Sequence, residues 1–359
     1  MALLEVNHLD VRFAMRGGEV RALRDVSFTL ERGERLGIVG ESGAGKSVAA
    51  FTILNLIAKP GYIAGGEIKF DGEVLNTMKP KAMQSIRGNR ISMIFQDPMM
   101  TLNPVLTIGE QMIECLKAHR RISSKDARAI ALHKLNQVFI PSPEKRLDQY
   151  PHELSGGMRQ RIIIAIALLL DPDIIVADEP TTALDVTIQA EIMELLLLLC
   201  EKHNVGLILI THDLGVVSQV TQRTLVMYAG RVIEQGPTRE IINDAQPPYT
   251  QGLINALPQM ATPGSRLNQI RGSMPTLTKI PAGCAFNPRC DFAADVCHEQ
   301  VPAFVASGNC KVACHMVQAM VKGESWTPIV TDARQRDKCR ARRHPGRDPR
   351  SRETFLAVR

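Results

Sequence analysis

Short apolar runs separated by turns dominate the first part of the chain. Residues 3–13, 22–30 and 67–70 alternate apolar and polar positions or run apolar, and turn residues bound them. Residues 36–39 form an apolar run that predicts a further strand. A helix is expected to follow, from Lys46 to about Ala58. The N-terminal part is therefore expected to be rich in strands, with one early helix.

The middle of the chain changes to helical spacing. Apolar positions recur three and four residues apart in residues 108–118 and 127–139, and Pro141 and Pro143 interrupt this pattern. Later apolar runs predict that strands return, at residues 174–177, 206–210, 224–228 and 232–234. The pattern indicates an α/β protein with a helical subdomain at residues 97–167.

A glycine-rich run follows the apolar strand at residues 36–39 and fits the pattern G-x-x-x-x-G-K-[ST]. It consists of Gly40, Glu41, Ser42, Gly43, Ala44, Gly45, Lys46 and Ser47. Between a strand and a helix, the glycines let backbone N–H groups turn toward phosphates, and the helix start adds the positive end of its dipole. Lys46 would contact the β- and γ-phosphates of a nucleotide, and the Ser47 hydroxyl would bind Mg²⁺.

Two carboxylates, Asp178 and Glu179, directly follow the apolar run at residues 174–177. A run of this kind fits a buried parallel strand, and open α/β sheets bind their ligands at the carboxyl ends of such strands. Asp178 is therefore expected to hold Mg²⁺, directly or through water.

A second glycine motif, Leu-Ser-Gly-Gly-Met-Arg-Gln, occupies residues 154–160. Ser155 suits an N-cap, and Gly156 and Gly157 expose their N–H groups, so the motif predicts another helix start that can bind an anion. Together with the glycine-rich run and the acidic strand end, it resembles the signature of the ATP-binding-cassette (ABC) family. In that family the signature clamps the γ-phosphate of ATP held by a partner subunit. The resemblance implies a P-loop ABC ATPase domain, with a mixed-sheet core and a helical subdomain.

The same resemblance implies roles for single residues. Glu179 would polarise the attacking water, and Gln96 would contact metal and water and couple to the membrane partner. His212 would contact the γ-phosphate, and Asp185 closes the segment that corresponds to the D-loop. Phe13 could stack on adenine or belong to the core of the first strand, and the residues leave both roles open.

Residues 236–330 exceed what a minimal ABC domain needs. The run Pro-Pro-Tyr-Thr-Gln-Gly-Leu-Ile-Asn-Ala-Leu-Pro at residues 247–258 resembles a P-Y-T-x-x-L-x-x-A-x-P segment of oligopeptide and dipeptide importer ATPases. Pro247 stands where that family usually has His. Asn-Pro-Arg-Cys at residues 287–290 is a further match. The resemblance covers the chain from Ala2 to about Met316 and is closest to the dipeptide-permease type.

This resemblance divides the chain into three parts. Residues 1–235 would form the ABC nucleotide-binding domain, and residues 236–330 a C-terminal domain of the peptide-importer type. Residues 331–359 hold ten Lys or Arg against four Asp or Glu, which equals the net charge of +6 of the whole chain. Because this segment has few apolar anchors, it is expected to be a disordered basic tail. The remaining, neutral body argues against a nucleic-acid partner.

Five of the eight cysteines lie between residues 284 and 314. A cluster of this kind in a cytosolic chain points to a metal or an iron–sulfur centre rather than to disulfides. The spacings are wider than in common zinc sites or ferredoxins, and by themselves they leave metal and unliganded thiols equally open. The resemblance to peptide importers implies a [4Fe–4S] cluster, with Cys310 as an extra cysteine that could replace Cys314. The expected ligands are Cys284, Cys290, Cys297 and Cys314.

No apolar run approaches the ~18–20 residues of a membrane-spanning helix, and the N-terminus lacks the features of a signal peptide. A cytosolic protein is expected, bound peripherally to the cytoplasmic face of the inner membrane through its partners. The resemblance implies a heterodimer with a second, related ATPase subunit. It also implies two membrane permease subunits and a periplasmic peptide-binding protein.

The expected function is ATP hydrolysis, with ATP and Mg²⁺, that energises the import of di- or oligopeptides. One alternative keeps the transporter and changes the cargo to nickel, another metal, glutathione or cationic peptides, because this subunit does not touch the cargo. The other alternative is a soluble ABC ATPase that acts on DNA or ribosomes. It is disfavoured because the chain lacks tandem cassettes, coiled-coil inserts and excess positive charge in its body.

Overall fold

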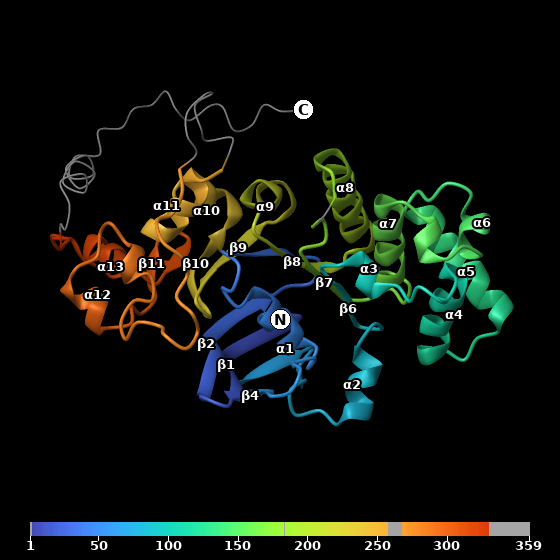
Figure 1. Ribbon diagram of the computed structural model, residues 1–359, viewed down its shortest axis with the longest axis horizontal. Helices are drawn as coiled ribbons and strands as arrows, with labels where there is room; N and C mark the ends of the chain where they lie inside the picture. The colour runs from blue at the N-terminus through green and yellow to red at the C-terminus, as the bar shows by residue number, and fades with distance from the viewer. Residues whose placement is uncertain (1, 183, 258–267, 330–359) are drawn as a thin grey trace.

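The computed structural model describes residues 2–182, 184–257 and 268–329. The predicted basic tail lies outside these residues. At the centre of the described chain is an eight-stranded sheet with the strand order β11-β12-β10-β9-β3-β8-β7-β6 (Figure 1). Its strands are β3 (Arg35–Val39), β6 (Ile91–Ile94), β7 (Ile174–Asp178), β8 (Gly206–Thr211), β9 (Arg223–Tyr228), β10 (Arg231–Pro237), β11 (Val305–Ser307) and β12 (Cys310–Val312).

Both parallel and antiparallel pairing occur in this sheet. Strands β9, β3, β8, β7 and β6 are parallel neighbours, and every residue of β7 and β8 is buried. Their unbroken apolar sequence reflects this burial on both faces. Strands β10, β12 and β11 extend the sheet with antiparallel pairs. The boundary predicted between residues 235 and 236 falls inside β10, which does not end the sheet.

A second sheet of four strands, in the order β2-β1-β4-β5, carries the N-terminus. Its register shifts between Val6 and Leu9 of β1, where His8 has a φ of 51°. This bulge changes the alternation, so that Leu9 points into the same core as Val6 although the two residues are three positions apart. The strands are β1 (Leu4–Met15), β2 (Gly18–Leu30), β4 (Gly61–Phe70) and β5 (Glu73–Val74).

Helix α1 (Lys46–Ile53) begins directly after the glycine-rich loop. Asn55 has a left-handed φ of 51°, and its N–H bonds to the Thr52 carbonyl while the next N–H bonds to that of Phe51. These two bonds form a Schellman motif, which closes the helix. The prediction of a helix to about Ala58 is therefore too long. The other helices around the two sheets are α2 (Pro80–Ile86), α8 (Val186–His203), α9 (Leu214–Val220), α10 (Thr238–Asn243) and α11 (Pro248–Asn255).

Helices α3 to α7 form a helical lobe beside β6 (Figure 1). The helices predicted at residues 108–118 and 127–139 are confirmed within a few residues. The first begins with a capping box, in which Thr107 and Glu110 bond to each other's backbone N–H. The elements are α3 (Pro98–Thr101), α4 (Ile108–His119), α5 (Ser124–Gln137), α6 (Pro143–Leu147), a 3₁₀ turn (Pro151–Glu153) and α7 (Gly156–Ala167).

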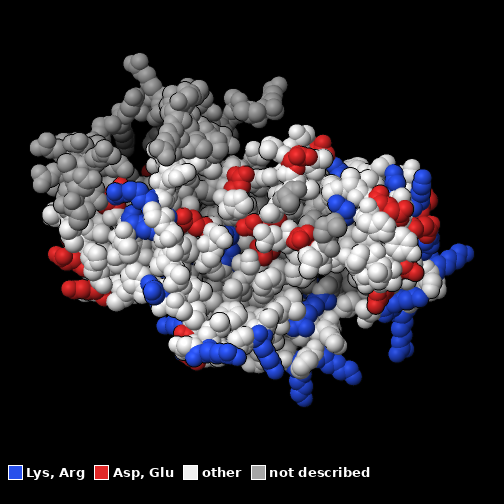
Figure 2. Space-filling model, viewed as in Figure 1, with Lys and Arg blue, Asp and Glu red and all other residues white. Residues whose placement is uncertain are grey.

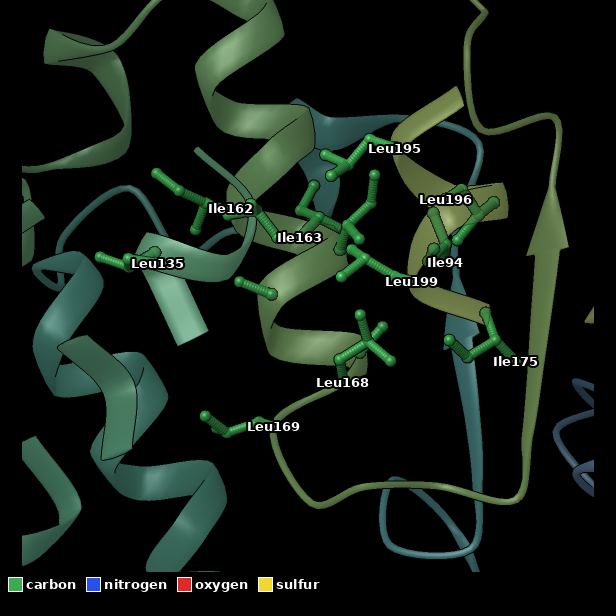
Figure 3. Close-up of a cluster of buried hydrophobic side chains, with 14 of the residues drawn as sticks. Ile94, Leu135, Ile162, Ile163, Leu168, Leu169, Ile175, Leu195, Leu196 and Leu199 are labelled. Atoms are coloured by element: carbon green, nitrogen blue, oxygen red, sulfur yellow. The ribbon is translucent and has the colours of Figure 1, made fainter. Parts of the chain in front are cut away.

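One apolar cluster joins the helical lobe to the central sheet (Figure 3). Leu135 of α5 and Ile163 of α7 belong to the same buried cluster as Ile94 of β6, Ile175 of β7 and Leu196 of α8. Because such cores pack at crystal-like density, α7 is held firmly against the strands. The second glycine motif, at the start of α7, thus has a fixed place relative to the ends of β6 and β7.

The C-terminal region adds a 3₁₀ turn (Asn287–Arg289), α12 (Asp295–Glu299) and α13 (His315–Lys322). It packs against the sheet through three aromatic rings, Tyr228 of β9, Tyr249 of α11 and Phe286. The ring centroids lie 4.6 to 5.3 Å apart in edge-to-face geometry. Among the described residues, no helix combines the length and the apolar character needed to cross a membrane.

Candidate nucleotide site

The glycine-rich loop runs from the end of β3 to the start of α1. Gly40, Gly43 and Gly45 have φ values of 152°, 80° and 100°, a region that L side chains rarely adopt. A Cβ on Gly40 would stand 2.3 Å from the Met227 carbonyl oxygen, so the loop also lies too close to β9 for any side chain. This loop is the P-loop that the sequence predicts.

The polar side chains of the glycine-rich motif at the start of α1 belong to Lys46 and Ser47. Lys46 is 5% exposed, and its Nζ donates to the carbonyls of Gly40 at 2.8 Å and Glu41 at 3.1 Å. Burial lowers the pKa of Lys46, although the carboxylates of Glu179 and Asp178 oppose this effect. Lys46 is therefore a buried cation at the centre of the loop.

Ser47 and Asp178, two of the residues predicted to bind magnesium, contact each other. The Ser47 hydroxyl donates to Asp178 Oδ1 at 3.1 Å, which joins the start of α1 to the end of β7. Asp178 is 2% exposed, and burial raises its pKa more than the hydrogen bond from Ser47 lowers it. The pair brings a hydroxyl and a carboxylate oxygen together, and Mg²⁺ prefers such ligands. The residues present thus fit this ion.

Glu179 lies at the centre of a second polar group. Its Oε2 accepts from Gln96 Nε2 at 3.2 Å and from the Thr182 hydroxyl at 3.0 Å, while His212 Nδ1 lies 3.4 Å from Oε1. The backbone of Glu179 has a φ of 46° and its N–H bonds to the Ile210 carbonyl at 2.8 Å. Unusual backbone conformations of this kind cluster at functional sites.

The second glycine motif begins α7 as predicted. Ser155 is the N-cap, and its hydroxyl accepts from the Met158 N–H at 3.3 Å. A Cβ on Gly157 would stand 3.0 Å from the Ile188 side chain, and the buried Gln160 bonds to the Pro180 carbonyl. The motif is therefore tied to the segment that follows Glu179.

The remaining predicted nucleotide residues take less distinctive positions. Asp185 is the N-cap residue of α8, without a hydrogen bond from its side chain to the helix. Phe13 of β1 is half-buried, pairs with Gly61 of β4, and packs against the core of the second sheet. This position is compatible with both roles considered for Phe13.

Four of the clustered cysteines line one cavity of about 40 Å³ in the C-terminal region. Burial raises the pKa of the thiols, to about 11 for Cys284 and about 12 for Cys290, with smaller contributions from the neighbouring cysteines. Within the described residues, no group of three or more His, Cys, Asp or Glu side chains has an arrangement that could hold a metal ion. The four cysteines are Cys284, Cys290, Cys297 and Cys314.

Cys310 lies apart from this cavity. It is on β12, where its Sγ is 3.9 Å from Glu240 Oε2 and occupies the space that a Cβ on Gly236 would need. It does not belong to the residues that line the cavity. This position gives no support to the idea that Cys310 substitutes for Cys314.

Two residues at the P-loop were missed by the reasoning from sequence. Arg289 bonds to the Glu41 carboxylate at 2.6 and 2.9 Å, and the Tyr249 hydroxyl accepts from the Glu41 N–H at 2.9 Å. Both belong to runs that the sequence singled out, at residues 247–258 and 287–290, but only for their resemblance to a family. Nothing in those runs indicates contact with the P-loop.

The P-loop, the acidic end of β7 and the second glycine motif on α7 define this protein as an ABC ATPase. The family described as ABC transporter matches residues 23–182. The dimeric ATP-binding cassette MJ0796, solved in a post-hydrolysis state bound to ADP and Pi, is similar with a TM-score of 0.59. It is 30% identical in sequence, and the match covers 66% of this chain and 99% of that chain.

The C-terminal region narrows this class. The family described as oligopeptide/dipeptide transporter, C-terminal region, matches residues 233–297. The dipeptide transport ATP-binding protein DppD of Haemophilus influenzae is 46% identical over 315 residues, 88% of this chain and 96% of that protein. The oligopeptide transport ATP-binding protein OppD of Salmonella typhimurium is 47% identical over 300 residues, 84% of this chain and 89% of that protein. The chain belongs to the family of ATP-binding subunits of oligopeptide and dipeptide ABC transporters.

Proposed function

We propose that this chain hydrolyses ATP to energise the import of di- and oligopeptides through a membrane permease. The convergence of Lys46, Asp178 and Glu179 at the carboxyl end of the parallel strands carries the ATPase part of the proposal. The relatives described above, which match over most of the chain, support peptides as the cargo.

The P-loop residues 40–47 would bind the phosphates of ATP through backbone N–H groups and Lys46. Ser47, Asp178 and Gln96 are the residues proposed to hold Mg²⁺, which neutralises phosphate charge during phosphoryl transfer. Glu179 would orient and deprotonate the attacking water, because Gln96 and Thr182 fix one of its oxygens. His212, 3.4 Å from the other oxygen, would contact the γ-phosphate.

Hydrolysis is proposed to need two subunits. Ser155, Gly156 and Gly157 form the start of α7, where N–H groups and the helix dipole suit an anion. In the closed dimer the start of α7 would face the γ-phosphate of the ATP bound to the partner subunit. Asp185 would lie at the contact between the two subunits. The partner is proposed to be a second, related ATPase, so that each of two sites combines a P-loop with a signature from the other chain.

The helical lobe is the proposed contact with the permease. Met100, Val105 and Phe139 are 84%, 74% and 64% exposed there, and Phe95, which directly precedes Gln96, is 37% exposed. Charged side chains of both signs are mixed over this lobe at the right of Figure 2. Two permease subunits and a periplasmic peptide-binding protein would complete an importer, with this subunit peripheral to the cytoplasmic face of the inner membrane.

The cysteine cavity is proposed to hold a [4Fe–4S] cluster. Its support is the donor set, since Cys284, Cys290, Cys297 and Cys314 line one cavity and four thiolates are the usual ligands of such a cluster. Because no metal-holding arrangement of side chains is found among the described residues, the proposal rests on this shared lining and on the resemblance to peptide importers. The role of the cluster would be to stabilise a loop-rich region that has few regular elements of its own.

Two experiments test these proposals. In the first, the complete importer is reconstituted in vesicles, and ATP hydrolysis and uptake are measured with dipeptides, longer peptides, glutathione and nickel. Peptides are expected to stimulate ATP hydrolysis. If only glutathione or only nickel stimulates it, that compound and not a peptide is the cargo. In the second, iron and acid-labile sulfide are measured in anaerobically purified protein. About four irons per chain are expected, whereas one zinc or no metal would refute the cluster.

A further inference from the structure

The P-loop residue Glu41 is held by the C-terminal region. Its N–H donates to the Tyr249 hydroxyl at 2.9 Å, and its two carboxylate oxygens accept from Arg289 at 2.6 and 2.9 Å. Met274 also lies near the loop, with its Sδ 3.9 Å from the place that a Cβ on Gly43 would take. The phosphate-binding loop is thus in direct contact with the region that distinguishes this chain from a minimal cassette.

Arg289 is fixed from all sides. Besides the two oxygens of Glu41, it donates to the Tyr228 hydroxyl at 3.3 Å and to the carbonyls of Arg271 at 2.8 Å and Gly272 at 3.3 Å. These five acceptors match the five N–H donors of a guanidinium. The residue is 9% exposed, and the hydrogen bond to Glu41 raises the pKa of Arg289. A fully bonded, buried cation of this kind has one orientation.

The charge of Glu41 requires such a partner. Its carboxylate belongs to the loop that must attract phosphates, and like charges repel each other. Its side chain is 29% exposed, so water and salt screen that repulsion only partly. Arg289 supplies the opposite charge and contacts both carboxylate oxygens. Without it, the P-loop would present an unpaired anion beside the phosphate site.

We propose that Arg289 is a positioning residue for nucleotide binding, which neutralises Glu41 and so keeps the P-loop attractive to the phosphates of ATP. This inference rests on the proposal that the P-loop binds ATP. Arg289 directly precedes Cys290, which lines the cysteine cavity. One short turn therefore connects the wall of that cavity to the nucleotide site.

The variant Arg289→Gln separates this role from a merely structural one. The dissociation constant of Mg-ATP, measured on the full-length chain with a fluorescent ATP analogue, is expected to rise about tenfold. The double variant Glu41→Gln/Arg289→Gln lacks the unpaired anion and is expected to regain most of the affinity. Added salt should also reduce the defect of Arg289→Gln, because it screens the remaining charge. A structural role predicts that the double variant, which has lost more hydrogen bonds, binds no better than the single one.

Three further variants control the experiment. Arg271→Gln removes an exposed cation from the same region, where its side chain is paired with Asp291, and is expected to leave affinity unchanged. Lys46→Ala should abolish binding, and normal binding there would overturn the P-loop site itself. Glu41→Gln alone is expected to bind ATP at least as tightly as the wild type. This variant tests whether the charge of Glu41 opposes ATP binding even if Arg289→Gln does not fold.

Three outcomes would contradict the role of Arg289 while leaving the nucleotide site itself in place. In the first, Lys46→Ala loses ATP binding while Arg289→Gln binds like the wild type. In the second, Glu41→Gln binds ATP more weakly than the wild type. In the third, the double variant binds ATP no better than Arg289→Gln.

Discussion

The amide of Gln96 donates a hydrogen bond to the carboxylate of Glu179 at 3.2 Å, across the ends of two neighbouring parallel strands. Gln96 follows β6 and Glu179 follows β7, which pair in register. The helical lobe begins two residues after Gln96, with α3 at Pro98. The Gln96 side chain therefore links a movement of this lobe directly to Glu179, the carboxylate that is proposed to activate water.

The variant Glu179→Gln should bind Mg-ATP but hydrolyse it about 10²–10⁴-fold more slowly, because the amide cannot accept a proton. Turnover is measured as phosphate release by the assembled complex, and binding by nucleotide titration. Glu194→Gln makes the same change at an exposed position of α8 and should leave both values unchanged. Wild-type turnover by Glu179→Gln would exclude this residue as the base.

The variant Ser155→Ala should lower ATP turnover in the assembled complex and leave nucleotide binding by the isolated chain intact, since Ser155 is proposed to serve the partner's site. Ser123 is a matched control. It is the N-cap of α5 in the same lobe and also accepts from a backbone N–H, so Ser123→Ala loses a similar cap, worth about 1 kcal/mol. Equal effects of the two variants on turnover would reduce the role of Ser155 to that of a helix cap.

Glu234 should make stability depend on pH. It is fully buried in β10. Its Oε1 accepts from the Gln246 N–H at 3.1 Å. Burial raises the pKa of this carboxyl from 4.5 to about 7, with Asp244 adding a smaller effect in the same direction, although hydrogen bonds from Thr250 and from the Gln246 N–H lower it. The folded state therefore binds this proton more tightly than the unfolded state.

The stability associated with the protonated Glu234 is complete below pH 4.5 and is lost as the pH rises to about 7. The variant Glu234→Gln should thus be more stable than the wild type at pH 8, by up to about 3 kcal/mol, and nearly equal to it at pH 4.5. Melting temperatures of both proteins across this range provide the measurement. A difference that does not change with pH would show that Glu234 does not titrate in this range.

The variant Phe286→Ala should loosen the C-terminal region, because it removes the ring that packs edge-to-face against both Tyr228 and Tyr249. Such truncations cost about 3–5 kcal/mol in well-packed sites. Limited proteolysis should then cut this region well before the nucleotide-binding core. Phe304, 45% exposed in the same region, serves as the control, and Phe304→Ala should resist protease like the wild type. Equal resistance of the two variants would contradict docking through these rings.

The sequence predicted the nucleotide site better than the C-terminal region. The cause is the distance along the chain between the residues that interact, which is short in the first case and long in the second. Gly45 and Lys46 are neighbours in a loop whose conformation follows largely from its own residues, so a local motif is informative. Glu41 and Arg289 are 248 positions apart, and neither residue type indicates the other. Strands β11 and β12 have three residues each, too few for a recognisable alternation.

The cysteines show the same limit. Their gathering within residues 284–314 indicated a metal or iron–sulfur centre, whereas their spacing left metal and unliganded thiols equally open, and only tertiary packing decides which of them share a cavity. Cys310 is four residues from Cys314, and yet its place on β12 turns it toward Glu240. The choice of four ligands came from a resemblance to a family. The four cysteines line one cavity, which no spacing rule could have predicted, and their role as ligands stays a prediction.

The pairing of β10 with β12 has a consequence for the synthesis of this protein. Glu234 of β10 pairs with Val312 of β12, so β10 leaves the ribosome long before its neighbour is made. At about 5–20 residues per second, this interval lasts several seconds. During that time a finished nucleotide-binding core carries an open strand edge, which is a template for aggregation. A nascent chain of this protein therefore depends on the prompt arrival of β11 and β12, and a fragment that stops after β10 keeps the open edge permanently.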